Sequence, residues 1–290
     1  MILIADSGST KCDWILIDRL GNQLYSQTTI GINPLNISES TIKNIILEIS
    51  EVLEKRNLID EVHFYGAGCG TEKSNQKIKS SFSSVFKNLK LIKVEEDIIA
   101  AVHATTITPG VIAILGTGSN CCYFDGEKII QHAPSLGYLL ADEGSGNYFG
   151  KELLKSFYLQ RMPASLAKDF ETMFGSDLES LFYNLYDLRQ PNTYLASYAI
   201  FLFQHRGHPF IENLLYDGIE TFIDNYLMLY SKELENYSVH FVGSIAYYTQ
   251  DIINKTLISK GFSAKSFIKK PINNLIKYII SNKYALQKTT

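Results

Sequence analysis

This 290-residue sequence lacks the features that mark membrane and exported proteins. No apolar run approaches the roughly 20 residues that a membrane-spanning helix needs. The first apolar stretch, Met1-Ile2-Leu3-Ile4-Ala5, ends at Asp6 and has no basic residues ahead of it, so it does not resemble a signal peptide. No low-complexity segment or linker separates parts of the chain. These absences favour a cytoplasmic protein without a membrane partner.

The sequence also contains few cysteines and carries a small net charge. The four cysteines (Cys12, Cys69, Cys121 and Cys122) form no CxxC pair, and two of them are adjacent, which disfavours a disulfide framework or a zinc site. We expect buried, reduced thiols. The 27 Lys and Arg residues against 30 Asp and Glu give a net charge of −3, which removes the electrostatic basis for binding nucleic acid.

Two common nucleotide-binding signatures are missing as well. The sequence has no GxxxxGK[ST] motif and no GxGxxG run that opens a helix. It contains instead two similar strand–loop–strand units, in which the apolar strands Ile2–Ala5 and Val111–Leu115 each precede a loop of glycine and hydroxyl residues. At an offset of 110 residues, Gly8 falls on Gly118. The repeat predicts two related halves.

Strands alternate with helices along the rest of the chain, which predicts an α/β fold. Isoleucines at helical spacing predict one amphipathic helix over residues 42–53, and residues 160–235 predict aromatic-rich helices. The further expected strands are Cys12–Ile17, Val62–Tyr65, Leu89–Val94 and Val239–Val242. We predict two domains, residues 1–105 and 106–290, with the aromatic-rich helices inserted in the second and the last helix free to pack back on the first.

The two glycine-containing loops are candidate phosphate-binding sites. Glycine lets backbone approach a ligand closely, and successive N–H groups in such turns form anion-binding concavities. Ser9, Thr10, Thr117 and Ser119 add hydroxyl donors. The alternative is that both loops are ordinary hairpin turns.

Asp6 lies at the end of the first strand, where a buried carboxylate is costly without a cationic partner. Mg²⁺ carried by ATP, held through its water shell, would supply that partner. The alternative is an aspartate that shapes the turn through its own backbone. The neighbouring Lys11 offsets phosphate charge or is solvated, and the sequence favours neither.

Asp97 ends a predicted strand between the two loops. Phosphoryl transfer to a hydroxyl needs a base near the acceptor oxygen, and a strand end is a rigid place for one. Alternatively, Asp97 is the N-cap of a helix after a solvated acidic cluster. The segment Asp142-Glu143-Gly144-Ser145-Gly146 has the same ambiguity between ligand carboxylates and acids at a helix N-terminus. Asn33 either binds sugar hydroxyls or shapes a turn.

Together these motifs resemble the actin-like ATPase and sugar-kinase superfamily, and more narrowly the BadF/BadG/BcrA/BcrD-type ATPase family that includes N-acetylglucosamine kinase. The matching segments are Asp6–Lys11 and Leu115–Asn120 for phosphate, Ala141–Gly146 for the acidic sugar site and Val242–Ser244 for adenosine. The chain departs from that pattern at Pro134-Ser135-Leu136-Gly137, where a Gly-Gly-aromatic-Gly run is usual, and at Ala141 and Val242, where glycine is common. The loop that shapes the sugar pocket is therefore altered.

The resemblance implies two actin-like, ribonuclease H-like domains with a nucleotide cleft between them, and ATP and Mg²⁺ as cofactors. It makes Asp97 the catalytic base. The Mg-ATP cradle implied by the matching motifs comprises Asp6, Gly8, Ser9, Thr10, Lys11, Gly116, Thr117, Gly118 and Ser119, with Gly243 and Ser244 under the adenosine. The implied sugar contacts are Asn33, Gly68, Asn120 and Asp142.

The expected activity is ATP-dependent phosphorylation of an N-acetylated amino sugar, either N-acetylglucosamine or N-acetylmuramic acid. Two other roles remain open, which are an ATPase that activates a partner enzyme and a non-catalytic sensor of sugar or nucleotide. A homodimer is also consistent with the resemblance.

Overall fold

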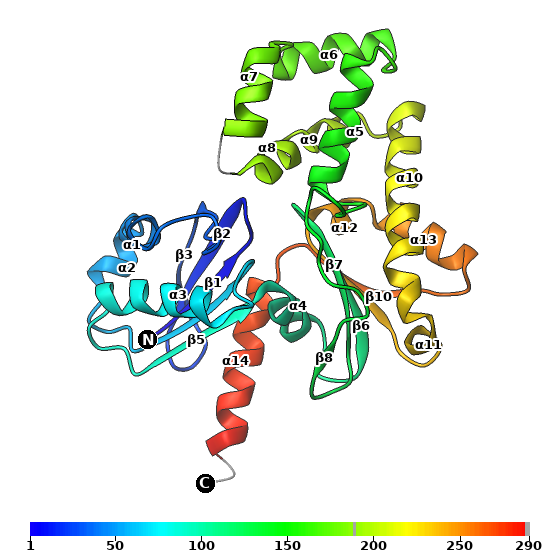
Figure 1. Cartoon of the computed structure of the whole chain (residues 1–290). Helices are drawn as coiled ribbons and strands as arrows, with labels where there is room; N and C mark the ends of the chain where they lie inside the picture. Colours follow the sequence, from blue (N-terminus) through cyan, green and yellow to red (C-terminus); the bar gives the residue numbers. More distant parts are fainter. Residues whose placement is uncertain (188–189, 288–290) are drawn as a thin grey trace. The chain divides into compact units, whose positions relative to one another are not determined.

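The computed structural model describes residues 1–187 and 190–287, and its contacts divide the chain into two compact units (Figure 1). Unit 1 comprises Met1–Ile107 and the segment from Lys270 onward, and unit 2 comprises Thr108–Lys269. The chain therefore changes unit twice, whereas the sequence placed one boundary near residue 105. The C-terminal helix α14 (Ile272–Gln287) packs on β1, β2 and α4 of unit 1.

Unit 1 is built on a five-stranded sheet in the order β3-β2-β1-β4-β5. Its strands are β1 (Ile2–Ser7), β2 (Lys11–Ile17), β3 (Gln23–Ile30), β4 (Glu61–Gly66) and β5 (Leu91–Glu96). The strands β1, β2 and β3 are antiparallel neighbours, and β1, β4 and β5 run parallel. The predicted hairpin of the first two strands is confirmed, while β3 was not predicted because its alternating exposure carries a weaker apolar signal.

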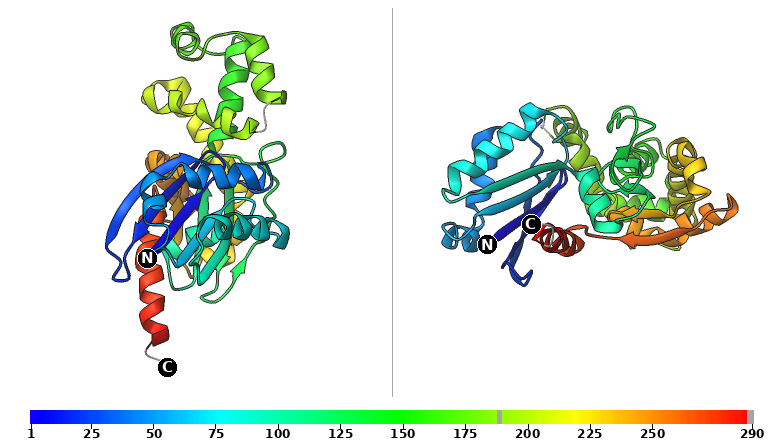
Figure 2. Two further views of the ribbon diagram at one scale, coloured as in Figure 1. Left: turned by 90° about the vertical axis from the view of Figure 1, so that its left-hand side faces the viewer. Right: turned by 90° about the horizontal axis from the view of Figure 1, so that it is seen from below.

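Helices cover both faces of this sheet. They are α1 (Glu39–Leu47), α2 (Ser50–Glu54), α3 (Glu72–Val85), α4 (Asp97–Thr105) and α14. Successive residues of β1 point to opposite faces, so Leu3 and Ala5 pack with α1 and α3, whereas Ile2 and Ile4 pack with α4 and α14. Figure 2 shows α3 and α14 on opposite faces of this sheet. Burial on both faces explains why β1 is a continuous apolar run.

The single helix predicted over residues 42–53 is wrong in one respect. The chain leaves the helical conformation at Ile49 (φ −89°, ψ 83°), so two short helices, α1 and α2, occupy this segment. The Ile49 side chain at the break is fully buried, as are Ile42 and Val52. The apolar spacing was therefore read correctly as buried helix, and the interruption was missed.

Unit 2 repeats the sheet of unit 1 in the order β10-β9-β6-β7-β8. Its strands are β6 (Gly110–Leu115), β7 (Ser119–Phe124), β8 (Ile129–Ile130), β9 (Val239–Val242) and β10 (Ala264–Ile268). The pairings are again antiparallel across β6, β7 and β8 and parallel across β6, β9 and β10. The predicted duplication and the α/β class are confirmed.

The structural offset between the two hairpins differs from the one that the sequence suggested. The strand β6 begins and ends 108 residues after β1, although the connection to the next strand is one residue shorter in unit 2, since Ser7 pairs with Cys12 whereas Leu115 pairs with Ser119. Gly8 therefore corresponds to Gly116 and not to Gly118, and Asp6 corresponds to Ile114. The offset of 110 maximised glycine and serine matches inside the loops, but the strand ends define the true alignment.

The helices of unit 2 follow the second hairpin and surround its sheet. They are α5 (Gly146–Tyr158), α6 (Ala164–Phe174), α7 (Leu178–Phe182), the π-helix η1 (Tyr183–Asp187), α8 (Pro191–Ser197), α9 (Ile200–Gln204), α10 (Pro209–Asn225), the 3₁₀ helix η2 (Leu227–Tyr230), α11 (Ser231–Leu234), α12 (Ser244–Tyr248) and α13 (Gln250–Ser259). The α6–α9 group extends beyond the strand ends of this unit (Figure 1).

Aromatic side chains from the predicted 160–235 helices form part of the core of unit 2. Phe170 of α6 is 1% exposed, and its ring lies 5.0 Å from Phe157, 5.7 Å from Tyr198 and 5.2 Å from Phe201 between centroids. The same cluster continues into β6 and β9. These rings therefore join the inserted helices to the sheet by packing.

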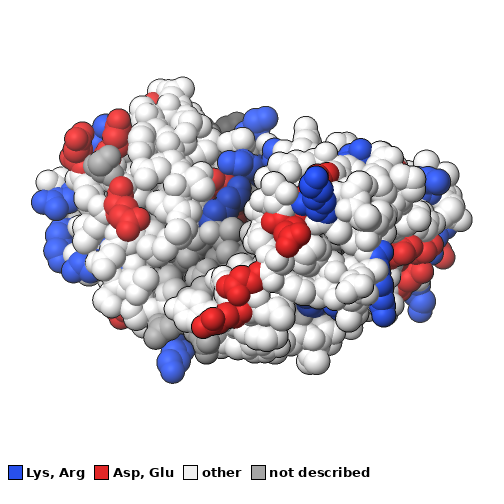
Figure 3. Space-filling view, turned by 90° about the horizontal axis from the view of Figure 1, so that it is seen from above, with Lys and Arg blue, Asp and Glu red and all other residues white. Residues whose placement is uncertain are grey.

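Three further expectations concern cysteine, membranes and surface charge. All four cysteines are buried and unpaired, as predicted. Within residues 1–187 and 190–287, no helix is both long and apolar enough to cross a bilayer. On the face drawn in Figure 3, positive and negative side chains are interspersed among uncharged ones.

Candidate functional site

The loop Gly8–Thr10 joins β1 to β2 and is held from one side by the residues that follow β3. The buried Ser7 hydroxyl accepts a hydrogen bond from the Ile32 N–H at 2.7 Å and donates one to the Ile32 carbonyl at 3.1 Å. The Gly31 N–H donates to the Thr10 carbonyl at 3.1 Å. Gly8 itself is exposed. One side of the loop is thus fixed, and its glycine is accessible.

Acidic and basic side chains gather beside this loop on β1 and β2. Asp6 lies directly opposite Asp13 in the antiparallel pair. Asp13 is 7% exposed and accepts hydrogen bonds from Lys11 Nζ at 3.0 Å, from Lys270 Nζ at 3.3 Å and from the Thr28 hydroxyl. Burial alone would raise the pKa of Asp13, but the Thr28 and Lys11 hydrogen bonds and the two ammonium charges lower it below its usual value. Lys11 therefore has a protein partner.

The pKa of Asp6 is shifted in the opposite direction. Burial, followed by the negative charges of Asp13 and Asp97, raises the pKa of Asp6 to about 7, and Lys11 and Lys270 only partly oppose this. A carboxylate with this excess of negative charge around it favours a cation nearby. Asp6 thus has the surroundings expected of a residue that attracts Mg²⁺.

Asp97 does not end its strand and is not an N-cap. The strand β5 stops at Glu96, which is the N-cap residue, and Asp97 is the first residue of α4. The predicted strand end and the alternative N-cap position were each wrong by one residue, because Glu96 occupies both. Asp97 nevertheless lies at the end of the sheet where β1, β4 and β5 finish, since its charge contributes to the raised pKa of both Asp6 and Cys69.

Asn33 and Gly68, two of the expected sugar contacts, lie next to each other in unit 1. A Cβ placed on Gly68, whose φ is +81°, would lie 2.3 Å from Asn33 Oδ1. That oxygen also accepts the Leu35 N–H at 3.0 Å, so Asn33 shapes its own turn, as one sequence interpretation held. A Cβ on Gly70 would lie 2.2 Å from Glu96 Oε1. The turn after β4, the turn after β3 and the start of α4 are therefore in contact.

In unit 2, Gly116–Gly118 joins β6 to β7 and is held by the residues that begin α5. The Ser119 N–H donates to Asp142 Oδ1 at 3.1 Å, and the Gly146 N–H donates to the Gly116 carbonyl at 2.8 Å. Asp142 has φ +70°, uncommon for a residue with a side chain. Burial raises the pKa of Asp142, although hydrogen bonds from Asn147 and Ser119 oppose the shift.

The expected adenosine motif lies against the same loop. A Cβ on Gly243 would lie 2.3 Å from the Leu115 carbonyl oxygen and 3.2 Å from the Gly116 nitrogen. Gly243 has φ +112°, so both its conformation and its close approach to β6 require glycine. Ser244 starts α12 directly after it. The second loop and the residues that begin α12 therefore pack against each other. Together they contain Thr117, Gly118, Ser119, Gly243 and Ser244.

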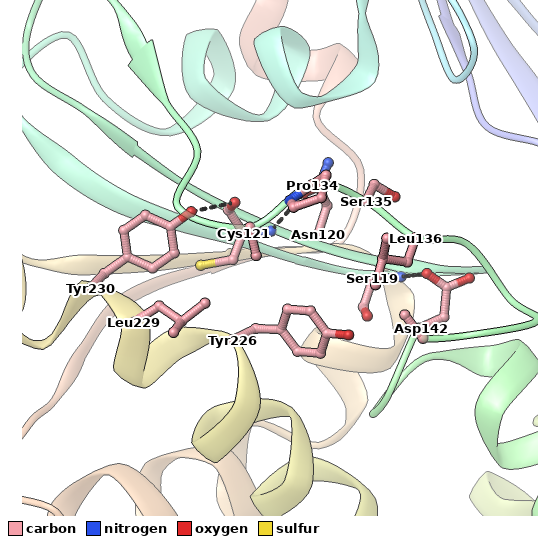
Figure 4. Close-up of a pocket in the computed structure, with 12 residues that line it drawn as sticks. Ser119, Asn120, Cys121, Pro134, Ser135, Leu136, Asp142, Tyr226, Leu229 and Tyr230 are labelled. Carbon is pink, nitrogen blue, oxygen red and sulfur yellow. Dashed lines mark hydrogen bonds between the residues drawn. The ribbon is translucent and has the colours of Figure 1, made fainter.

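A narrow pocket opens beside this second loop (Figure 4). Ser119, Asn120 and Asp142 line one part of it, and residues 133–136, which include Pro134, Ser135 and Leu136 of the altered segment, line another. The floor comes from the aromatic-rich region, as Tyr226, Leu229 and Tyr230. Asn120 Oδ1 accepts the Cys121 N–H at 2.9 Å and Gln131 Nε2 at 3.0 Å. Sequence reasoning missed the floor residues because nothing local marks them.

The residues present fit Mg-ATP in the space that both loops leave at their glycines. In the described part of the chain, a Cβ at Gly116 would meet nothing within 4 Å, and the nearest atom to one at Gly8 is the Lys11 carbonyl oxygen at 3.9 Å. Both loops thus have space at their glycines. Residues 1–187 and 190–287 contain no group of three or more His, Cys, Asp or Glu side chains that could hold a metal. Mg²⁺ near Asp6 would therefore need water and phosphate oxygens as its other ligands.

Solved structures with this fold include sugar kinases. A Porphyromonas gingivalis protein assigned as an N-acetylglucosamine kinase is 31% identical and aligns with a TM-score of 0.89 over 98% of this chain and 100% of that chain. A Chromobacterium violaceum protein with the same assignment is 15% identical, with a TM-score of 0.69 over 96% of this chain and 98% of that one. A ROK family glucokinase from Streptomyces griseus, in complex with glucose and AMPPNP, is 13% identical, with a TM-score of 0.58 over 95% and 97%.

Among curated proteins, the N-acetyl-D-glucosamine kinase of Dictyostelium discoideum is 25% identical over 164 residues. This match covers 52% of the chain and 51% of the kinase, so it spans about half the length of that protein. No family model matches the sequence.

Proposed function

The chain belongs to the N-acetylglucosamine kinase-like family of sugar kinases, and we propose that it transfers the terminal phosphoryl group of Mg-ATP to a hydroxyl of an N-acetylated amino sugar, either N-acetylglucosamine or N-acetylmuramic acid. The observation that carries this proposal is the group formed by Asp6, Asp97 and the Gly8–Thr10 loop at one end of the unit 1 sheet. It combines a metal-attracting carboxylate, a phosphate loop and a separate acid.

In this proposal the two glycine loops hold the phosphates of ATP. Backbone N–H groups of Gly8–Thr10 and of Thr117 and Gly118 act as fixed donors that need no rearrangement when charge develops in the transition state, while the Gly116 N–H donates to the Gly118 carbonyl and closes the loop. Lys11, already oriented by Asp13, contributes a positive charge near the first loop. Gly243 and Ser244 support the adenosine. Mg²⁺, when bound near Asp6 through water, would neutralise phosphate charge and favour departure of ADP.

Asp97 is the proposed base. Its carboxylate accepts the proton of the attacking sugar hydroxyl as that oxygen bonds to the terminal phosphorus and the bond to the ADP oxygen breaks. Asn33 and the Gly68 turn contact the sugar in unit 1, and Asn120 and Asp142 contact it in unit 2. Catalysis then rests on positioning and electrostatic stabilisation, without a covalent intermediate on the protein.

The test of the function is sugar-dependent ADP release from Mg-ATP. The panel comprises N-acetylglucosamine, N-acetylmuramic acid, N-acetylmannosamine, glucosamine and glucose. Strong stimulation by one N-acetylated sugar, with a phosphorylated product by mass spectrometry, supports the proposal and names the substrate. ADP release at a rate that no sugar changes would indicate an ATPase that acts on a partner. Nucleotide binding without turnover would indicate a sensor.

Asp97→Asn should separate binding from chemistry. The amide cannot accept the hydroxyl proton, so kcat should fall by about 10²–10⁴-fold, which is the usual contribution of general-base catalysis. The dissociation constant for AMPPNP, measured by calorimetry, should change little. Glu95→Gln, which neutralises the acid two residues earlier, is the matched control and should keep near-normal kcat. Normal turnover in Asp97→Asn would exclude Asp97 as the base.

A further inference from the structure

The residues that begin α5 form a brace behind the second glycine loop. The Gly146 N–H donates to the Gly116 carbonyl at 2.8 Å, and the Asn147 N–H donates to the Thr117 carbonyl at 3.0 Å. The Asn147 side chain adds a second bond to that carbonyl, from Nδ2 at 2.8 Å. Two consecutive carbonyls of the loop are therefore held toward the start of α5.

Asp142 completes the brace. Its Oδ2 accepts a hydrogen bond from Asn147 Nδ2 at 2.7 Å, while its Oδ1 accepts the Ser119 N–H at 3.1 Å. A Cβ on Gly118 would lie 2.9 Å from Oδ2, so the loop passes directly over this carboxylate. Both amide hydrogens of Asn147 are thus used, and its side chain ties the loop to Asp142.

This pattern of bonds has a consequence for the other side of the loop. In a trans peptide the carbonyl and the following N–H point in opposite directions, and the described chain contains no cis peptide bond. Because the Gly116 and Thr117 carbonyls point toward α5, the N–H groups of Thr117 and Gly118 point away from it. Two adjacent N–H groups with a shared direction form an anion-binding concavity.

We propose that Asn147 is a positioning residue that holds these two N–H groups in the orientation that binds the phosphates of the nucleotide. This inference rests on the proposed function, because it takes that nucleotide to be ATP. Asn147 is fully buried, and within the described residues its Oδ1 has no hydrogen-bond partner. Burying an acceptor without a hydrogen-bond partner destabilises the fold. We explain why Asn147 nevertheless lies in the core by the role of its two side-chain donors, which orient the loop.

The test compares nucleotides that differ in their phosphates. Asn147→Leu removes both donors at similar volume, and calorimetry measures its affinity for Mg-AMPPNP and for AMP. We expect the dissociation constant for Mg-AMPPNP to rise about tenfold, which corresponds to about 1.4 kcal/mol, because the two N–H groups lose their fixed orientation. Affinity for AMP, which lacks the outer phosphates, should stay within about twofold. In turnover, the KM for ATP should rise more than the KM for sugar, because Asp142 keeps the Ser119 N–H as a hydrogen-bond partner.

A matched control and a second variant keep the result unambiguous. Thr256→Val removes another buried polar group of unit 2, one that bonds only within its own helix, and should leave both affinities unchanged. If Asn147→Leu does not fold by circular dichroism, Asn147→Asp serves instead, because it keeps the shape but places a second carboxylate against Asp142. Equal losses of AMPPNP and AMP, or no loss of either, would overturn the inference.

The test of Asn147 can be interpreted whether or not the proposed kinase activity is found. A wild-type protein that binds Mg-AMPPNP but phosphorylates no sugar refutes the kinase, while the comparison of Asn147→Leu with wild type still decides the role of Asn147. A wild-type protein that binds no nucleotide overturns both. Selective loss of AMPPNP binding in the variant supports the inference in either case.

Discussion

Replacing Gly31 by alanine should disturb the first phosphate loop from outside it. A methyl group on Gly31 would lie 2.3 Å from the Gly8 carbonyl oxygen and 2.5 Å from the Ser9 carbonyl oxygen. Both are backbone atoms, so no side chain can rotate away to relieve the contact. The loop or the residues after β3 must move by about 1 Å to restore ordinary van der Waals separation.

The expected magnitude follows from this displacement. Overpacking of a tightly packed segment costs about 1–3 kcal/mol, and each kcal/mol lowers Tm by about 2–4 °C in a domain of this size, so Tm should fall by roughly 2–12 °C. A misplacement of about 1 Å in a phosphate-positioning loop costs on the order of 100-fold in kcat/KM. Thermal unfolding and sugar-dependent ADP release measure the two effects on the same preparation.

Gly8→Ala is the informative control. The nearest atom to its added methyl is the Lys11 carbonyl oxygen at 3.9 Å, an ordinary contact, so Tm should stay within about 2 °C of wild type. If phosphates lie against this loop, the methyl still obstructs them, and the affinity for AMPPNP should fall. Wild-type Tm and activity in Gly31→Ala would refute the packing argument. Wild-type affinity in Gly8→Ala would refute the placement of the phosphates.

Two predictions concern stability alone. The buried His240, whose Nδ1 lies 2.8 Å from the Ser266 hydroxyl, has its pKa lowered to about 4, chiefly by burial and then by Lys265. The unfolded chain therefore takes up this proton first as pH falls from 6.5 to 4, and the free energy of unfolding should decrease by about 1.4 kcal/mol per pH unit across that window. Urea unfolding at several pH values should show that the free energy of unfolding depends less steeply on pH in His240→Gln than in wild type. An unchanged pH dependence would show that His240 is not its source. Phe170→Ala should lose about 3–5 kcal/mol because it leaves a cavity among packed rings. A loss below about 1 kcal/mol in chemical unfolding would mean that the α6–α9 group packs only weakly on the rest of unit 2.

The parts of the fold that could be predicted are those whose cause is local. The strand β1 is a continuous apolar run because helices cover both of its faces, and the Gly8–Thr10 loop breaks that run with residues typical of turns. The same reasoning located β6 and its loop. Within such segments the burial pattern follows from composition and spacing alone.

The supporting residues of the site could not be predicted because their partners are distant in sequence. Asp13 sits inside an apolar strand, and one of its partners, Lys270, lies 257 residues away. Asn147 reaches back 30 residues to the Thr117 carbonyl. An isolated Asp or Asn in a sequence carries no sign of such a bond, since only the packed arrangement of strands and helices decides which donors and acceptors meet.

The structural alignment of the two hairpins also shows how a duplicated fold can divide its chemistry. At the offset of 108 residues Asp6 corresponds to Ile114, and Asp13, which lies opposite Asp6, corresponds to Asn120, which lies opposite Ile114. These two carboxylates of the first hairpin thus have uncharged counterparts in the second. The second loop instead has the hydrogen-bonded brace of Asn147 and Asp142. On the proposed function, unit 1 would provide the groups that attract the metal and accept the proton, because those steps need charge. Unit 2 would provide a rigid set of neutral donors, because holding phosphates through the reaction needs fixed geometry more than added charge.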